Sequence, residues 1–198
     1  MNKKSLAVQL SKLISISSNN PSLEQYQTDS EIAAEILWNV FMNNDTKDKI
    51  IADLGCGNGI FGIGALILGA KLVYFVDIDR LNIETTKTNC KFKNAEYFPL
   101  DVNEFNKKVD VVIMNPPFGV QNEHADRIFL KKAMKLSNKI YSLHKVESKK
   151  FIDILAKDHM FNVENIIELD FLLKKTMKFH EKNKYLVKVG CWVLKRKV

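Results

Sequence analysis

Apolar and polar positions follow two different periods along this chain of 198 residues. Short apolar runs rich in Val, Ile, Tyr and Phe predict strands, and apolar residues at helical spacing predict helices between them. The predicted strands cover residues 49–55, 70–79, 95–102, 109–119, 139–145, 162–173 and 185–195. The predicted helices cover residues 59–70, 80–92, 125–137 and 148–158, after two helices that precede residue 49.

The alternation of strands and helices predicts an α/β fold with a doubly wound, mostly parallel sheet and an antiparallel strand at the end of the chain. The length favours a single domain, residues 1–198, with a helical region at 1–48 and the sheet core at 49–198. Ligands of such sheets bind beyond the carboxyl ends of the strands. The ends of the predicted strands are therefore the candidate site positions.

The segment DLGCGNGIFGIG, residues 53–64, follows the first predicted strand and opens a helix. Gly55, Gly57 and Gly59 permit a sharp turn and a close approach of the backbone to a ligand. The GNGIFG part also matches the dinucleotide-binding fingerprint G-x-G-x-x-G, with Asp77 placed 20 residues after its first glycine. The loop indicates a nucleotide-like ligand, and a nicotinamide dehydrogenase is an alternative at this point.

Acidic residues follow the next two predicted strands. Asp77 can accept hydrogen bonds from both hydroxyl groups of a ribose, which serves NAD and S-adenosylmethionine equally. Its other candidate role is a helix N-cap, for which Asp79 is better placed. Asp101 is suited to accept a hydrogen bond from an adenine amine, with the Val102 N–H nearby, although an ordinary acidic turn fits the pattern equally well.

The fourth predicted strand ends in Asn115-Pro116-Pro117-Phe118. An exocyclic amine conjugated to a ring is a poor nucleophile, and two hydrogen-bond acceptors stabilise the positive charge that develops on it during alkylation. Asn115 offers a side-chain carbonyl and Pro116 a backbone carbonyl, while the prolines add no competing N–H. Phe118 can stack on an extruded base. The motif favours amine methylation over hydride transfer, for which the sequence offers no proton relay.

The basic residues are concentrated at one end of the chain. The formal net charge is +7, yet residues 171–198 contain nine Lys or Arg against one Glu, so the first 170 residues carry a net charge of −1. Such a tail is either a solvated lysine face or a surface for a polyanion such as RNA.

Three cysteines without C-x-x-C spacing, Cys56, Cys90 and Cys191, predict a reducing compartment and no structural zinc site. The sequence lacks an apolar run of the roughly 20 residues that a membrane-spanning helix needs. We therefore expect a cytoplasmic protein without a membrane partner.

The sequence DLGCGNG followed by NPPF resembles the amino-methyltransferases that use S-adenosylmethionine. Three further stretches narrow the resemblance to the small-subunit ribosomal RNA adenine-N6 methyltransferases of the methyltransferase-like family: LEQYQTDSEIAAEIL (23–37), NPPFGVQNEHADRIFLKKAM (115–134) and IYSLHK (140–145). The resemblance implies a seven-stranded, Rossmann-like sheet and a short N-terminal helical extension that closes as a lid over the cofactor, S-adenosylmethionine.

The resemblance also implies roles for individual residues. The cofactor contacts fall on Gln25, Thr28, Gly55, Gly57, Asn58, Ile60, Asp77, Asp101 and Val102. The catalytic residues are Asn115, Pro116, Pro117 and Phe118. The RNA contacts fall in the basic tail, on Lys174, Lys175, Lys178, Phe179 and His180. Read from the pattern alone, Thr28 or its neighbour Asp29 is a helix N-cap.

The expected reaction is methyl transfer to N6 of adenine in structured RNA, with small-subunit ribosomal RNA as the substrate and a small zinc-ribbon protein as a candidate activator. Two alternatives remain. A protein glutamine-N5 methyltransferase faces the same problem of an unreactive nitrogen, although such enzymes usually have Tyr where Phe118 stands. A non-catalytic RNA-binding assembly factor has no physical need for both an intact glycine loop and an intact NPPF motif.

Overall fold

The computed structural model describes residues 1–16, 28–117, 125–174 and 184–197. Seven strands form one sheet in the order β3-β2-β1-β4-β5-β7-β6. The strands are β1 (Ile50–Leu54), β2 (Leu72–Asp77), β3 (Ala95–Pro99), β4 (Val111–Met114), β5 (Lys139–Lys145), β6 (Phe161–Lys174) and β7 (Lys184–Arg196). The first five run parallel, and β7 is antiparallel to both of its neighbours, which confirms the predicted sheet.

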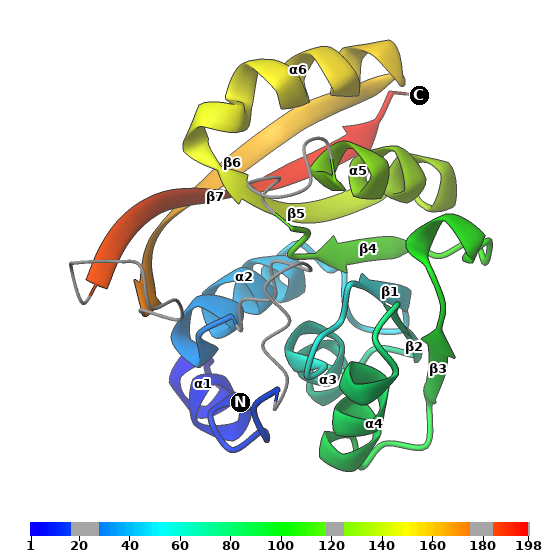
Figure 1. Cartoon of the computed structure of the whole chain (residues 1–198), viewed down its shortest axis with the longest axis vertical. Coiled ribbons are helices and arrows are strands. Elements are labelled where there is room, and N and C mark those ends of the chain that lie inside the picture. The colour runs from blue at the N-terminus through cyan, green and yellow to red at the C-terminus, as the bar shows by residue number, and fades with distance from the viewer. Residues whose placement is uncertain (17–27, 118–124, 175–183, 198) are drawn as a thin grey trace.

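Helices cover both faces of the sheet (Figure 1). They are α1 (Lys3–Leu10), α2 (Ser30–Met42), α3 (Ile60–Ile67), α4 (Arg80–Asn89), α5 (Ala125–Leu136) and α6 (Lys149–Asp158), with short 3-10 helices η2 (Val102–Glu104) and η3 (Val146–Ser148). One buried cluster packs the four helices α1, α2, α3 and α4 on one face of the sheet, and a second cluster packs α5 and α6 on the other face. The result is a three-layer α/β/α arrangement.

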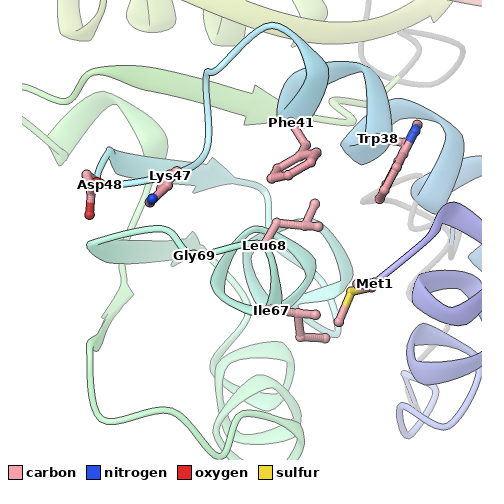
Figure 2. Close-up of a pocket in the computed structure, with 8 residues that line it drawn as sticks. All are labelled: Met1, Trp38, Phe41, Lys47, Asp48, Ile67, Leu68 and Gly69. Carbon is pink, nitrogen blue, oxygen red and sulfur yellow. The ribbon is translucent and has the colours of Figure 1, made fainter.

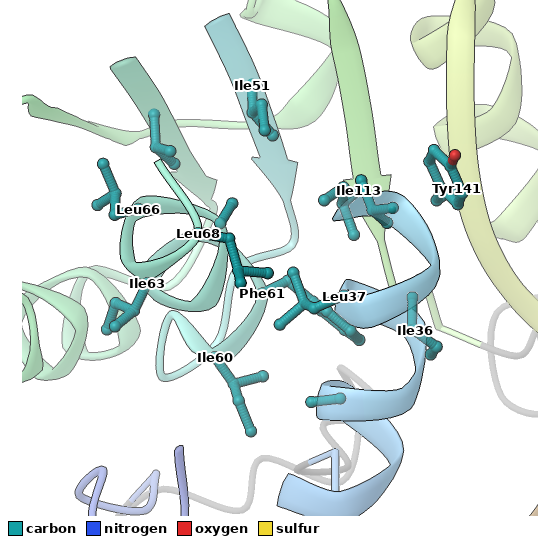
Figure 3. Close-up of a cluster of buried hydrophobic side chains, with 14 of the residues drawn as sticks. Ile36, Leu37, Ile51, Ile60, Phe61, Ile63, Leu66, Leu68, Ile113 and Tyr141 are labelled. Carbon is teal, nitrogen blue, oxygen red and sulfur yellow. The ribbon is translucent and has the colours of Figure 1, made fainter. Parts of the chain in front are cut away.

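The pleat of the strands separates these two clusters. In β1, Ile51 belongs to the cluster beneath α2 and α3, while its neighbour Ala52 belongs to the cluster beneath α5. Leu37 of α2 and Phe61 of α3 point toward one another over β1 and β4 (Figure 3). The two N-terminal helices are thus part of the main core, because their apolar faces are buried against α3 and the sheet.

The last two strands form a hairpin that is longer than the rest of the sheet. β5 pairs with β7 only as far as Lys145, which lies opposite Val189, whereas β6 and β7 continue to the pair Lys174 and Lys184. Five further residues of β7 at about 3.4 Å each carry the hairpin roughly 17 Å beyond the carboxyl end of β5. The part of the basic tail at Lys174 and Lys184 is therefore carried to the edge of the sheet at which the parallel strands end, whereas Lys195 and Arg196 lie at the opposite edge.

Candidate active site

The carboxyl ends of the parallel strands meet in one row. Leu54 at the end of β1 pairs with Val76 of β2 on one side and with Met114 of β4 on the other. The glycine loop and Asn115 consequently start at the same level, on either side of the point where the strand order reverses between β1 and β4. The structure brings together motifs that are about 60 residues apart in the sequence.

Asp77 anchors the glycine loop from the neighbouring strand. Its Oδ2 accepts a hydrogen bond from the Gly57 N–H at 2.9 Å, and its Oδ1 accepts from the Asp79 N–H at 2.9 Å and from Asn82 Nδ2 at 3.3 Å. A carboxylate has about four acceptor positions, so these three donors leave capacity for one further hydroxyl. Burial raises the pKa of Asp77, and the three N–H donors oppose that rise. As expected, Asp79 caps α4.

The loop backbone requires glycine at its turning points. Gly57 has φ 56° and Gly59, the residue before α3, has φ 83°, both in the left-handed region. A Cβ on Gly59 would also lie 2.7 Å from Cγ2 of Thr86. The Thr86 hydroxyl in turn donates to the carbonyl of Gly57 at 2.8 Å, so α4 holds the loop in place.

Asp53 lies behind the loop and received no role in the sequence analysis. Its side chain is 1% exposed, and its Oδ2 accepts the N–H of Gly62 in α3 at 2.8 Å. Burial raises the pKa of Asp53 to about 8; the Gly62 hydrogen bond opposes the shift and the nearby charge of Asp77 adds to it. An acidic residue inside an otherwise apolar strand was the available signal.

Asn115 is held by a residue from the N-terminal region. Its Nδ2 donates to Oγ1 of Thr28 at 3.0 Å, and Thr28 is 5% exposed. The Asn115 Oδ1 is buried and has no hydrogen-bond partner among the described residues. Asp29, not Thr28, caps α2, since its side chain accepts the N–H of Glu31 at 2.8 Å. The N-cap role considered for Thr28 is therefore wrong.

The chain that follows α1 also reaches the glycine loop. Asn58, which is 2% exposed, donates from Nδ2 to the carbonyl of Ile14 at 3.3 Å. Asn89 of α4 bonds both the N–H and the carbonyl of Ile14, and it donates to the Asn58 carbonyl. The Asn58 side chain and carbonyl are thus used within the protein, which leaves its backbone N–H for any contact with a cofactor.

The remaining described cofactor candidates line the same edge. Asp101 lies two residues after Pro99, the pairing partner of Asp77, and accepts the N–H of Asn103 at 2.7 Å as the cap of η2. Val102 is 6% exposed and Ile60, the first residue of α3, is 4% exposed. The turn role of Asp101 is therefore confirmed, and its contact with an adenine amine stays a prediction.

The YSLHK stretch contains two buried polar side chains that are in contact with each other. Ser142 Oγ lies 2.6 Å from Nε2 of His144, and His144 Nδ1 lies 3.9 Å from Oδ2 of Asp126 in the first turn of α5. Burial lowers the pKa of His144 to about 3, so the imidazole is neutral at physiological pH. With side chains 0% and 1% exposed, Ser142 and His144 connect β5 to α5 without access to a ligand.

Several predicted residues lie outside the described ranges: Gln25, Phe118, Lys175, Lys178, Phe179 and His180. The backbone of Lys174 is described at the end of β6, opposite Lys184. In the described part of the chain, no group of three His, Cys, Asp or Glu residues is placed to hold a metal ion. The helices described are all too short or too polar to cross a membrane.

A shallow hollow lies at the opposite edge of the sheet, where the strands begin (Figure 2). Trp38 and Phe41 of α2 face Ile67 at the end of α3, with Met1 and Gly69 beside them. Its lining is mostly apolar and includes none of the predicted site residues. The predicted site residues that the structure describes therefore lie away from this hollow.

Comparison with known proteins shows the family to which the chain belongs. The methyltransferase small domain family matches residues 26–187, which include the glycine loop, Asp77 and the NPPF motif. The chain belongs to this family. The rRNA N(6)-adenosine-methyltransferase METTL5 of Danio rerio is 36% identical over 177 residues, which cover 84% of this chain and 86% of the zebrafish protein.

Solved structures of other methyltransferases have the same fold. The crystal structure of PH1948 from Pyrococcus horikoshii superposes with a TM-score of 0.94 at 38% identity, covering 100% of this chain and 99% of its own. Magnesium protoporphyrin IX methyltransferase from Synechocystis, solved with bound SAM, has a TM-score of 0.66 at 14% identity and covers 100% and 98% of the two chains. At that identity the similarity concerns the fold alone.

Proposed function

We propose that this methyltransferase transfers a methyl group from S-adenosylmethionine to the exocyclic N6 of adenine in structured RNA, with small-subunit ribosomal RNA as the substrate. The observation that carries the proposal is the buried Oδ1 of Asn115, a hydrogen-bond acceptor without a described partner at the carboxyl end of β4. A buried polar atom of this kind is costly unless a ligand satisfies it. An amine N–H satisfies it directly.

The chemistry at this position follows from the donors and acceptors. Bound S-adenosylmethionine supplies a methyl group on a positively charged sulfur, whose C–S bond breaks as the new C–N bond forms. Asn115 Oδ1 and the Pro116 carbonyl accept the two amine hydrogens, which stabilises the charge that develops on nitrogen. The alkylated nitrogen is acidic enough to lose a proton to water, so the reaction requires no side chain as general base. Phe118 stacks against the base.

The described residues at the cofactor position fit S-adenosylmethionine. Asp77 keeps one acceptor position for a ribose hydroxyl, and the left-handed backbone at Gly55 and Gly57 lets the loop turn sharply after β1. Asp101 and the Val102 N–H stand at the next strand end for the adenine ring. Ile60, Asn58 through its backbone, Gln25 and Thr28 complete the proposed set.

The substrate class is supported by the hairpin of β6 and β7 and by the name of the zebrafish relative. The strand ends at Lys174 and Lys184 lie side by side, beyond the carboxyl end of β5. Cations there attract phosphates to the edge where Asn115 lies. We propose that Lys174, Lys175, Lys178, Phe179 and His180 contact the RNA, and that binding weakens with rising salt.

We further propose that residues 1–48 border the cofactor site as a lid region on the sheet core formed by 49–198. Ile14 contacts Asn58 of the glycine loop, and Thr28 contacts Asn115, so two described points of this region meet the site. A small zinc-ribbon activator that pairs with a sheet edge, and action in the cytoplasm, are parts of the same proposal.

The test compares two asparagine variants. Asn115→Ala removes the proposed acceptor and should lower methyl transfer about 100-fold or more, by analogy with the removal of one charge-stabilising hydrogen-bonding group from other active sites. The affinity for S-adenosylmethionine should stay within about twofold. Asn94→Ala is the control, since Asn94 bonds the carbonyls of Ala70 and Lys71 at the opposite edge.

Equal loss of cofactor binding and turnover in Asn115→Ala would show that Asn115 is structural and refute its catalytic role. Transfer of label to a protein and not to RNA would instead select glutamine methylation. Both readouts come from one reaction with labelled cofactor, separated into RNA and protein fractions.

A further inference from the structure

Helix α4 has polar side chains on the face that it buries. Its buried residues are Asn82, Ile83 and Thr86, and the half-buried Asn89 continues the face of Asn82 and Thr86, because residues three or four apart are neighbours on a helix surface. A helix that packs on a sheet normally buries an apolar stripe. Asn82 is accounted for by its hydrogen bond to Asp77. Thr86 and Asn89 contact the glycine loop instead.

Thr86 and Asn89 bond two consecutive carbonyls of the glycine loop. The Thr86 hydroxyl donates to the carbonyl of Gly57 at 2.8 Å, and Asn89 Nδ2 donates to the carbonyl of Asn58 at 3.0 Å. A carbonyl oxygen can only accept, so the direction of both hydrogen bonds is fixed. The Asn89 amide also has one possible orientation, because its Oδ1 accepts the N–H of Ile14 and its Nδ2 donates to the Ile14 carbonyl.

The hydrogen bond from Thr86 determines the direction of a backbone donor in the loop. The N–H of Asn58 belongs to the same peptide unit as the carbonyl of Gly57, and this peptide unit is trans. The C=O and N–H groups of a trans peptide unit point in opposite directions. Since the carbonyl is turned toward α4 by Thr86, the N–H of Asn58 is turned away from α4.

This N–H differs from its neighbours in the loop. The other N–H groups of residues 55–59 all donate to acceptors within the protein. The N–H of Asn58 has no acceptor in the described part of the chain, although Asn58 is 2% exposed. A buried backbone N–H without a partner is costly, and an acceptor atom of a bound ligand removes that cost.

We propose that Thr86 and Asn89 are positioning residues of the cofactor site. They hold the carbonyls of Gly57 and Asn58 against α4 and so present the N–H of Asn58 to an acceptor atom of S-adenosylmethionine. The inference rests on the proposed function and deepens it, because it names residues that set the affinity for the cofactor. Neither side chain needs to touch the cofactor, so both should affect its Kd and leave kcat at saturating cofactor unchanged.

The test of Thr86 compares Thr86→Ala with Thr86→Ser. Both variants lack the methyl group and only the serine variant keeps the hydroxyl, so the difference between them reports the hydrogen bond. Calorimetry without RNA should give a Kd for S-adenosylmethionine about fivefold higher in Thr86→Ala, which corresponds to a hydrogen bond of about 1 kcal/mol. In the cofactor-free protein, the carbonyl carbon resonance of Gly57 should differ between the two variants and match wild type more closely in Thr86→Ser.

The test of Asn89 uses a matched asparagine as its control. Asn89→Ala removes the hydrogen bonds to Asn58 and Ile14 and should raise the cofactor Kd about fivefold or more. Asn94 also donates to two backbone carbonyls, but at the opposite edge of the sheet, so Asn94→Ala should keep the wild-type Kd within about twofold. All Kd values are measured well below the unfolding temperature of each variant, which separates cofactor affinity from stability.

Three results would overturn the inference. They are equal cofactor Kd values in Thr86→Ala and Thr86→Ser, a Gly57 carbonyl resonance that is the same in both, and a lower kcat at saturating cofactor with an unchanged Kd. If the wild-type protein binds S-adenosylmethionine but methylates no RNA, the proposed function fails, whereas the binding series still tests the roles of Thr86 and Asn89.

Discussion

A single methyl group added to Gly62 should separate α3 from the sheet. A Cβ at this position would lie 2.2 Å from Cε1 and 2.7 Å from Cζ of Phe75, and 2.8 Å from Cγ1 of Val73. Carbon atoms in contact are normally about 3.5–4.0 Å apart, so the helix or the ring must move by about 1 Å. Phe75 is 0% exposed and stacks on Tyr97 with ring centroids 5.4 Å apart, which leaves it little freedom.

The expected cost follows from two opposing effects. Overpacking of a core lowers the free energy of unfolding by about 1–3 kcal/mol, and replacing a helical glycine by alanine raises it by up to about 1 kcal/mol. Gly62→Ala should therefore be destabilised by about 1–2 kcal/mol, or a few degrees in Tm for a chain of this size. Because Gly62 also donates to Asp53, a displaced α3 should weaken cofactor binding too.

Urea denaturation of Gly62→Ala and Gly64→Ala tests this account. A Cβ on Gly64 would meet the Cδ1 of Leu37 at 2.2 Å, but its next contacts are at 3.5 Å, and the end of a leucine can rotate away. Gly64→Ala should accordingly lose less stability than Gly62→Ala. A Gly62→Ala protein as stable as wild type, or more stable than Gly64→Ala, would refute the packing argument.

Two further variants probe buried polar groups. Asp53 has a pKa of about 8 in the folded protein against about 3.8 unfolded, so the native state loses stability as pH rises between these values. Between pH 5 and 7, the free energy of unfolding of Asp53→Asn minus that of wild type should increase by about 1 kcal/mol per pH unit in denaturation experiments. Parallel curves of unfolding free energy against pH for the two proteins would contradict the burial argument. Tyr141→Phe should lower the free energy of unfolding in urea by about 1–3 kcal/mol and leave kcat unchanged. The reason is that the Tyr141 hydroxyl donates to Asp45 at 2.6 Å and accepts from Asn43 at 3.0 Å. Lost turnover at full stability would contradict this structural role.

The pattern of the sequence was sufficient to predict the strands. The strand predicted at 139–145 coincides with β5, and those predicted at 162–173 and 185–195 differ from β6 and β7 by one residue at each end. Apolar periodicity depends only on local order along the chain, which explains this success, and the site at the carboxyl ends of the strands stays a prediction.

Contacts between distant segments could not be predicted in this way. The bond between Thr28 and Asn115, and that between Asn58 and Ile14, depend on how α1 and α2 pack over α3. The raised pKa of Asp53 likewise results from burial that several elements create together. The sequence pattern identified which residues are polar at the strand ends, and packing determined what each of them bonds.

The most direct test of the account is to incubate the wild-type protein with labelled S-adenosylmethionine and unmodified small-subunit ribosomal RNA, digest the RNA and identify the labelled nucleoside. The account predicts N6-methyladenosine from wild type and from Asn94→Ala, and its loss in Asn115→Ala. Label on a different nucleoside, or label on protein alone while the cofactor is bound, would contradict it.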